Sequence, residues 1–353
     1  MQDTVDIGII GLGSRGLLWK RIVENNPALN LVAVSDVHRP NITRHETYRY
    51  YEDYLRLLDS GVDAVFVAPQ NKYRPKVVTD ALARGIHVFC EIPPGRSVHD
   101  MEDIIACEKK AGGAVLGFGF THRFHSAVSK AKEITDSGKY GKILWMNGVH
   151  GKSGGDDFES IWRSNREWAG GGILLDQGIR LIDLFLFFAG DFSEVKSIVS
   201  TSLWNIPVDD NAFALLRNSQ NQIAMLHASS VHWKNTFTLE ICLEKGFITI
   251  RGNLTPTGDY GPRETLIVSP RPDRHENHLD GLFEESITCF DTAAATDREV
   301  DTFVDCIRSG TIVQMGSSAD ALKSMKLVDR IYRSDRGWWR RWNLSGNDAI
   351  RAG

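Results

Sequence analysis

The sequence lacks a strong net charge, a long apolar run and an N-terminal signal pattern. Its formal net charge is only -4, so no basic excess favours nucleic acid or an anionic membrane as a partner. The longest apolar run, 179–189, is too short to span a bilayer and contains Arg180 and Asp183. No basic segment followed by an apolar segment opens the chain, so we expect no secretory signal and a cytoplasmic location.

Cysteine is also scarce. The chain has five cysteines, far apart in the sequence and without the CxxC or Cys/His spacing of zinc sites. We therefore expect no metal and interpret the cysteines as buried free thiols in a reducing compartment. What is present fits an enzyme: 42% hydrophobic residues, 24% charged residues and 353 residues in all, a length that predicts two domains.

The first third of the chain alternates short apolar runs with segments of helical spacing. Runs of this length, separated by helices, are typical of a parallel sheet that is buried on both faces. We predict a doubly wound Rossmann domain over residues 1–121, an α/β fold. Its expected strands are 5–10, 31–35, 48–51, 62–67, 86–90 and 114–118, and its expected helices are 17–23, 54–58, 77–83 and 101–110.

The pattern changes after about Thr121, where consecutive strands with short turns favour an antiparallel or mixed sheet. We predict an α+β domain over residues 122–334 with a largely antiparallel open sheet, helices on one face and a partner subunit on the other. Its expected helices are 127–137, 174–188, 298–309 and 318–333; its strands are 143–149, 195–203, 211–216, 223–230, 236–243 and 246–251; its loops are 151–157 and 256–276, the latter as loop or sheet edge. Residues 335–353 would form a C-terminal arm.

A glycine motif gives the strongest local signal. Gly11, Gly13 and Gly16 match G-x-G-x-x-G, directly after a predicted strand and at the start of a predicted helix. The glycines allow a tight turn, close approach of a pyrophosphate and close packing of helix on strand. Ser14 and Arg15 complete a helix N-terminus whose free N–H groups favour phosphate, so this loop is predicted to bind a dinucleotide.

Asp36 indicates which dinucleotide. It ends the second strand, about 20 residues beyond the glycine loop, where an acidic residue binds the adenosine ribose hydroxyls. Its carboxylate would repel a 2′-phosphate, which favours NAD(H) over NADP(H). His38 and Arg39 follow it, and either could accept a phosphate; the alternative role for Asp36 is a helix cap.

With these residues in hand, the chain resembles the Gfo/Idh/MocA family of sugar and inositol oxidoreductases along nearly its whole length. Several motifs in the right order are more specific than any one of them. They are Gly11–Gly16, Val62–Val65 leading to Ala68–Asn71, Gly85–Val88 leading to Glu91–Pro93, Gly170–Gly178, and Leu181–Asp183.

The resemblance implies hydride transfer between nicotinamide and a sugar carbon, in a cleft between the domains. It assigns Pro69, Asn71, Glu91 and Pro93 to cofactor binding, and Arg123 with Asp176 and Arg180 to the substrate. Trp162 and Arg163 look most like members that act on sugar nucleotides. The open sheet implies a homodimer or homotetramer.

Two of the family's three catalytic groups are replaced. The lysine of a Glu-Lys-Pro turn is Ile92 here, the histidine after the glycine run is Arg180, and Asp176 remains. Isoleucine cannot accept a proton, and arginine stays protonated, so neither is a general base. Arg180 could instead bind an anion or polarise a carbonyl, or form an ion pair with Asp176 at i, i+4 spacing.

Three interpretations stay open. The protein is an oxidoreductase with another proton-transfer group, an NAD-binding pseudoenzyme acting as sensor or partner subunit, or a redox-neutral epimerase or lyase that holds NAD tightly. We favour the first, with Asp176, Arg180 and Lys152 as the catalytic set. The candidates for the proton-transfer group are Tyr73, which stands at a further family histidine position, and Lys152, His122, His125, His150 and His232.

The segment 336–342 interleaves arginines with tryptophans. Such a segment can stack on nucleic acid bases or lie at a membrane interface. Because the rest of the chain is not basic, we expect instead an arm packed on the Rossmann domain or on a second subunit.

Overall fold

The computed structural model describes residues 4–38, 47–254, 260–271, 284–292 and 294–351. The chain divides into two compact units. The first contains the described residues of 1–120, 167–170 and 296–325, and the second those of 121–166, 171–295 and 326–353. This division differs from the predicted boundaries, because 296–325 groups with the first unit and 335–353 with the second.

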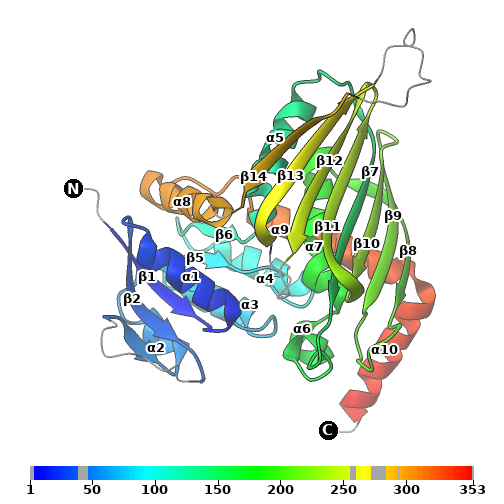
Figure 1. Ribbon diagram of the computed structural model, residues 1–353. Coiled ribbons are helices and arrows are strands. Elements are labelled where there is room, and N and C mark those ends of the chain that lie inside the picture. Colours follow the sequence, from blue (N-terminus) through cyan, green and yellow to red (C-terminus); the bar gives the residue numbers. More distant parts are fainter. Residues whose placement is uncertain (1–3, 39–46, 255–259, 272–283, 293, 352–353) are drawn as a thin grey trace. The chain divides into compact units, whose positions relative to one another are not determined.

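A parallel sheet organises the first unit (Figure 1). In the described chain its strand order is β3-β2-β1-β4-β5-β6, the doubly wound order in which the chain starts in the middle and crosses over in both directions. The strands are β1 Val5–Ile10, β2 Leu29–Ser35, β3 Arg49–Tyr51, β4 Ala64–Val67, β5 His87–Cys90 and β6 Leu116–Phe118. The predicted fold class is confirmed, including the short third strand.

Aromatic side chains fill one face of this sheet. Trp19 of α1 lies 5.0 Å from Phe89 of β5, and Phe89 lies 5.4 Å from Phe303 of α8, measured between ring centroids. Phe303 therefore explains why 296–325 belongs to the Rossmann unit. The helices are α1 Ser14–Asn25, α2 Tyr54–Leu58, α3 Arg74–Leu82, α4 Val98–Glu108 and α8 Ala294–Ser309; α9 Ser318–Ser334 contributes residues to both units.

A mixed sheet organises the second unit, in the order β14-β13-β12-β11-β7-β10-β9-β8. Among the described strands of this second sheet, β7 and β10 are the one parallel pair, so the prediction of a largely antiparallel sheet is confirmed. The strands are β7 Ile143–Ser153, β8 Phe192–Ser200, β9 Asn211–Asn218, β10 Ile223–Ser229, β11 Val231–Leu243, β12 Gly246–Leu254, β13 Tyr260–Pro270 and β14 Ser286–Asp291.

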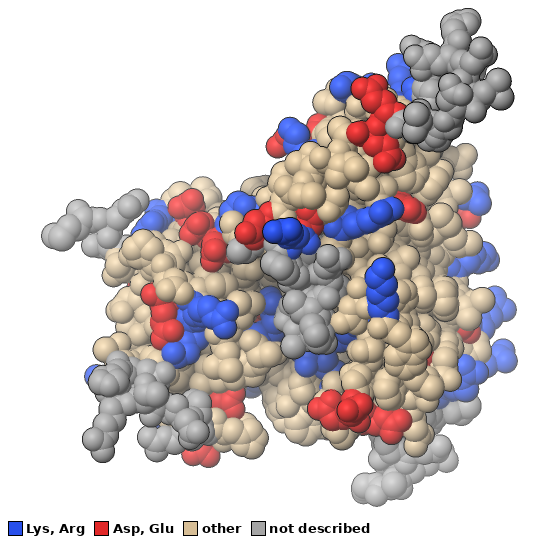
Figure 2. Space-filling view, viewed as in Figure 1, with Lys and Arg blue, Asp and Glu red and all other residues tan. Residues whose placement is uncertain are grey.

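The two faces of this sheet differ in burial. One face packs against α5 (Ser126–Asp136) and α7 (Ile179–Ala189), and its side chains, such as Leu226 and Leu239, are buried. The other face exposes Ile198, Phe213 and Leu215 at 69%, 45% and 54% of their surface. Figure 2 shows mostly uncharged surface over the second unit, with Lys and Arg side chains scattered on it and along its right-hand edge.

Two predicted loops contain strand. β7 continues to Ser153, which pairs with Val231 of β11, so Lys152 lies on a strand and not in a 151–157 loop. The predicted loop or edge 256–276 contains β13, which is the second strand from the sheet edge. Its side chains alternate, and Leu266 and Val268 are buried in the core. Residues 256–259 and 272–276 lie outside the described residues. β14 was not predicted.

The predicted helix 174–188 consists of two parts. One turn of π-helix, η3 Leu174–Gly178, precedes the α-helix α7. Single π turns within helices are frequent at functional sites. This turn carries Asp176, which places the most prominent acidic residue of the motif at the irregularity.

The arginine- and tryptophan-rich arm is a helix, α10 Arg336–Arg351, that packs on its own unit. The Trp342 ring stacks on Tyr332 at 6.1 Å, and the Arg166 guanidinium lies 3.8 Å from its centroid. These contacts lie within the second unit and so differ from the expected packing on the Rossmann domain.

Two expectations from composition concern membrane-spanning helices and the cysteines. In the described chain, every helix is too short or too polar to cross a membrane. The described cysteines are free; Cys90 is buried, but Cys289 is exposed, so the expectation of buried thiols is wrong for Cys289. The remaining short elements are η1 Thr121–Phe124, η2 Trp162–Ser164 and α6 Arg166–Ala169.

Candidate functional site

The glycine loop joins β1 to α1 in the first unit. A Cβ on Gly16 would lie 1.8 Å from the carbonyl oxygen of Gly11, and one on Gly11 would lie 2.6 Å from the nitrogen of Pro69, so both positions require glycine. A Cβ on Gly13 would meet nothing within 4 Å. The loop is therefore packed tightly on the protein side and open at Gly13.

The start of α1 is not capped by a side chain. Gly13 is the N-cap residue and has no side chain to bond the first N–H groups of the helix. These N–H groups and the positive end of the helix dipole favour an anion. Together with the space at Gly13, they fit the diphosphate of a dinucleotide.

Asp36 lies against this loop. Its carboxylate accepts hydrogen bonds from the backbone N–H of Leu12 at 2.6 Å and of His38 at 2.9 Å. Asp36 thus holds the glycine loop at the end of β2, where an acidic residue can also accept from ribose hydroxyls. Arg39, the alternative phosphate partner, lies outside the described residues.

The other predicted cofactor residues follow β4 and β5 at their carboxyl ends. Glu91, 2% exposed, accepts from Arg15 Nε at 2.7 Å and from Trp19 Nε1 at 2.8 Å. The Arg74 guanidinium donates to the carbonyl oxygens of Pro69 and Pro93 at 2.8 and 2.6 Å, which ties the two strand ends together.

Asn71 adds a buried polar atom to this edge. Its Nδ2 donates to the Ala169 carbonyl at 2.9 Å, while Oδ1 has no hydrogen-bond partner among the described residues. Buried polar atoms without a partner are rare, and a bound ligand is one explanation. The predicted cofactor residues therefore gather at the edge where doubly wound sheets bind nucleotides.

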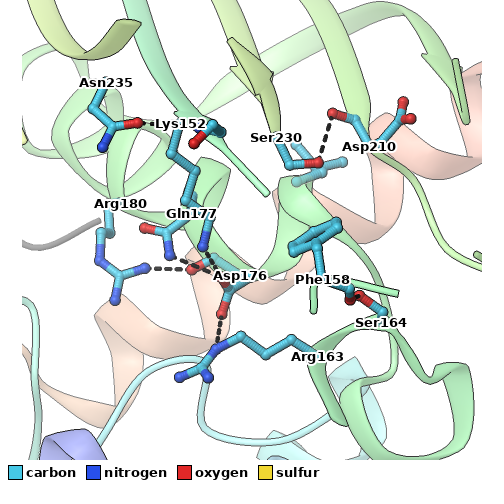
Figure 3. A network of polar contacts seen from close by, with 12 residues as sticks. Lys152, Phe158, Arg163, Ser164, Asp176, Gln177, Arg180, Asp210, Ser230 and Asn235 are labelled. Carbon is cyan, nitrogen blue, oxygen red and sulfur yellow. Dashed lines mark hydrogen bonds and ion pairs between the residues drawn. The ribbon is translucent and has the colours of Figure 1, made fainter. Parts of the chain in front are cut away.

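A second cluster, in the second unit, surrounds Asp176 (Figure 3). Asp176 Oδ2 lies 3.4 Å from Lys152 Nζ, and Oδ1 accepts from Arg163 Nε at 3.1 Å. Gln177 Nε2 donates to Oδ2 at 2.7 Å, and Arg180 donates to the main-chain oxygen of Asp176. We call Lys152, Arg163, Asp176 and Arg180 the charged network.

Within the charged network the pKa values of Asp176 and Lys152 are both lowered, for different reasons. Burial raises the pKa of Asp176, but Lys152, Arg163 and Arg180 outweigh it and hold that pKa well below its usual range. Burial lowers the pKa of Lys152; Asp176 opposes this, and the two arginines add to it. Asp176 therefore stays ionised, while Lys152 loses its proton more readily than an exposed lysine.

His150 lies beside the network. It points to the same side of β7 as Lys152, two residues away, and is 1% exposed. Neither ring nitrogen has a hydrogen-bond partner among the described residues. Burial, then the cations of Arg180 and Lys152, lower its pKa well below the usual value, so His150 is neutral at pH 7.

The remaining predicted residues have other partners. Arg123 donates to both oxygens of Asp183 at 2.8 and 2.6 Å, a buried bidentate pair that anchors η1 to α7. Trp162 lies under Arg163, with the guanidinium 4.5 Å from the ring centroid. Tyr73 packs edge-on against Trp168 at 6.1 Å, and Ile92 is buried.

The other candidate histidines are separate from the charged network. His125 pairs with buried Glu264 at 3.0 Å, and the His122 ring lies 5.5 Å from that of His125. His232 Nδ1 bonds the Lys234 carbonyl at 2.5 Å, within its own strand. The His122 ring also lies 6.2 Å from that of His150, whereas the contacts of His125 and His232 are with residues outside the charged network.

Sequence reasoning missed Asp209, which fixes the glycine run before Asp176. Its carboxylate is fully buried and accepts from the N–H groups of Gly172 and Leu174, each at 2.8 Å, and from the Tyr332 hydroxyl at 2.6 Å. A Cβ on Gly172 would lie 2.0 Å from the Asp209 carbonyl oxygen, so the run must be glycine there. No local signal marks a partner that lies 35 residues away in the sequence.

A nucleotide-binding Rossmann unit joined to an α+β unit with an open sheet defines a class of dinucleotide-dependent oxidoreductases. Two models of one family match the chain: oxidoreductase family, NAD-binding Rossmann fold, over residues 5–120, and GFO/IDH/MocA C-terminal domain, over residues 128–249. The chain belongs to the Gfo/Idh/MocA oxidoreductase family. Its first unit is the family's NAD-binding Rossmann domain.

Individual relatives are distant. The chain is 27% identical to 2,7-anhydro-N-acetylneuraminate hydratase of Mediterraneibacter gnavus over 67% of this chain and 65% of that protein. It is 25% identical to levoglucosan dehydrogenase of Pseudarthrobacter phenanthrenivorans over 65% of this chain and 64% of that protein. The matched regions thus span just under two thirds of these two relatives.

A solved structure shares the fold over nearly the whole chain. Levoglucosan dehydrogenase in complex with NADH and levoglucosan superposes with a TM-score of 0.81, covering 95% of this chain and 98% of that one, at 20% identity. At this identity the likeness concerns the fold.

Proposed function

We propose that this protein is an NAD(H)-dependent oxidoreductase that transfers hydride at a carbon of a sugar or sugar-nucleotide substrate. The observation that supports this most is the contact between Lys152 and Asp176, a buried amine beside an ionised carboxylate on the motif that the family uses for its substrate. When bound, NAD⁺ supplies an acceptor for the hydride. NADP(H) is disfavoured by Asp36.

Lys152 is the proton acceptor in this proposal. Oxidation of a sugar alcohol releases the hydroxyl proton, which needs a base of suitable pKa within hydrogen-bond reach. Burial lowers the pKa of Lys152, and Asp176 stabilises the ammonium that forms when the proton arrives. Lys152 would thus supply, from β7, the function that Ile92 cannot.

In this proposal Asp176 positions the cationic side chains, and Arg180 binds the substrate oxygen that reacts. Asp176 fixes the Lys152 amine and the Arg163 guanidinium through its two oxygens. Arg180 stays protonated and can donate to the substrate oxygen, which becomes a carbonyl as hydride leaves. Trp162 and Arg163 would contact the sugar.

A redox-neutral reaction is the second candidate. It is favoured by the similarity to a protein named as a hydratase, an activity with no net oxidation. The same Lys152–Asp176 pair could move the proton of an elimination or epimerisation with NAD retained. Ile92 and Arg180 also keep open the non-catalytic alternative, in which the protein binds NAD and a sugar as a sensor or partner subunit.

NADH titration followed by fluorescence tests the cofactor assignment. The wild type should bind, and Gly13→Arg should abolish binding because its side chain fills the open space at Gly13. Asn25→Arg, which adds the same side chain at the exposed far end of α1, is the matched control. Binding that survives Gly13→Arg would remove the basis of the proposal.

Incubation with sugars then separates the candidates. With NAD⁺ and a panel of sugars, an oxidoreductase accumulates NADH, measured by absorbance. A redox-neutral enzyme changes the sugar, measured by NMR, without net NADH. Cofactor binding with neither change supports the non-catalytic alternative.

We also propose that the protein forms a homodimer or homotetramer through the exposed face of its second sheet. Large apolar side chains project from neighbouring strands there: Phe213 of β9 lies opposite Ile198 of β8, and Leu215 follows two residues along β9. Large apolar side chains exposed together on neighbouring strands are typical of an interface between subunits.

A further inference from the structure

The charged network contains more positive than negative charge. Three cations, Lys152, Arg163 and Arg180, act on one carboxylate, Asp176. The groups that influence Lys152 electrostatically are the same carboxylate and the two arginines. His150 is neutral there and adds no positive charge.

Such an excess is costly where water is scarce. Lys152 is 9% exposed, and Asp176 has 16% of its side chain exposed. Like charges near one another in a partly buried site repel, and an anionic ligand relieves this repulsion. An excess of cations at a substrate site is thus a reason to expect a negatively charged group on the ligand.

Arg163 has the donors to bind that group. Its Nε is used by Asp176 Oδ1, and its guanidinium lies over the Trp162 ring, so its plane is held from two sides. Within the part of the chain that the structure describes, its two Nη groups make no hydrogen bond, and 31% of the side chain is exposed. A guanidinium held in this way presents parallel N–H groups that match the two oxygens of a carboxylate.

We propose that the substrate is an acidic sugar and that Arg163, supported by the charge of Lys152, binds its carboxylate. This inference rests on the proposed function and specifies its substrate class. A carboxylate matches one planar guanidinium. The Trp162 ring covers one face of the Arg163 guanidinium, so the other face and the edge that carries the two Nη groups stay open to it. Asp176 is the positioning residue, because it orients both cations without needing to touch the acid group.

The test compares matched sugars on the protein saturated with NADH. Isothermal titration calorimetry measures the dissociation constants of glucuronate, galacturonate and mannuronate, each against its parent hexose and the corresponding hexose 6-phosphate. At least one uronate should bind at least about tenfold more tightly than both of its counterparts, as expected for one charge-assisted, bidentate contact.

Three variants assign the preference to Arg163. Arg163→Gln should abolish the preference for the uronate, and Arg163→Lys, which keeps the charge but loses the fork, should retain part of it. Lys130→Gln removes a positive charge from exposed α5 and should leave the preference intact. Thermal melts of each variant show that the fold is kept, and NADH binding should be unchanged.

Equal binding of acid and neutral sugar in every pair would overturn the inference, as would tighter binding of the phosphate or an intact preference in Arg163→Gln. A neutral hexose that is turned over while the uronates are ignored would overturn this inference but leave the proposed oxidoreductase function standing. Failure to bind NADH would instead remove the proposed function.

Discussion

Lys152 Nζ lies 3.4 Å from Asp176 Oδ2, with the lysine on a central strand and the aspartate on a π turn. The contact joins β7 of the second sheet to η3, the turn that carries the family motif. It also gives the second unit a buried, titratable amine.

Lys152→Arg should keep the charge and lose the activity. Arginine holds its proton at any pH of interest, so it cannot act as a base. We expect turnover to fall by about 10²–10⁴-fold, the usual contribution of a general base, with NADH affinity unchanged. Steady-state kinetics and NADH titration measure both; Lys142→Arg, an exposed position at the edge of the same strand, is the control. Turnover that survives in Lys152→Arg would assign the proton transfer elsewhere.

His150→Phe should make the protein less sensitive to acid. The folded-state pKa of His150 is lowered, so below about pH 6.5 the unfolded chain binds a proton that the folded chain does not. The wild type therefore loses stability as the pH falls below that value, by about 1.4 kcal/mol per pH unit until the folded-state pKa is reached. Phenylalanine removes this contribution.

Urea unfolding of both proteins between pH 5 and 8 measures that difference. The gap in unfolding free energy should move in favour of His150→Phe as the pH falls. His99→Phe, at an 80% exposed histidine, controls for the loss of a histidine. A gap that stays constant with pH would show that His150 has an ordinary pKa.

Asp209→Ala should destabilise the second unit by about 3 kcal/mol, because it leaves two buried N–H groups and one hydroxyl without their acceptor. Tyr332→Phe removes a single one of these bonds and should cost about 1 kcal/mol. Chemical denaturation measures both values, and the exposed Asp156→Ala is the control. Equal stability of Asp209→Ala and the wild type would mean that the glycine run is held by other contacts.

Phe213→Lys combined with Leu215→Lys should convert the proposed oligomer to a monomer. Two ammonium groups on the exposed sheet face would meet their copies across a two-fold interface and repel. Light scattering after size exclusion measures the mass. Ile312→Lys places one such charge on a 77% exposed isoleucine of the first unit and should leave the mass unchanged. A double variant that stays oligomeric would place the interface elsewhere.

The local patterns sufficed for the fold of the first unit. Each buried strand there is a short apolar run. The contacts that require glycine at Gly11 and Gly16, with Pro69 and with Gly11 itself, lie within this one unit. The second unit was harder to predict. Lys152 lies between Gly151 and a Ser-Gly-Gly-Asp-Asp stretch, a composition typical of a loop, yet the pairing of the next residue, Ser153, with Val231 extends the strand past it.

The site depends on long-range contacts even more. The i, i+4 spacing left open an ion pair between Asp176 and Arg180, whereas in the structure Arg180 donates to the main-chain oxygen of Asp176. The partners of the Asp176 carboxylate, Lys152 and Arg163, lie 24 and 13 residues away, and no periodicity identifies them. Arg123 was expected at the substrate, but the structure gives its guanidinium to Asp183.

The pH dependence of the reaction tests the central role of Lys152 most directly. We expect kcat/KM for sugar oxidation to rise with pH through one ionisation below the usual lysine pKa of about 10.4, and the residual rate of Lys152→Arg to lack this ionisation. The same ionisation in wild type and Lys152→Arg would contradict this expectation.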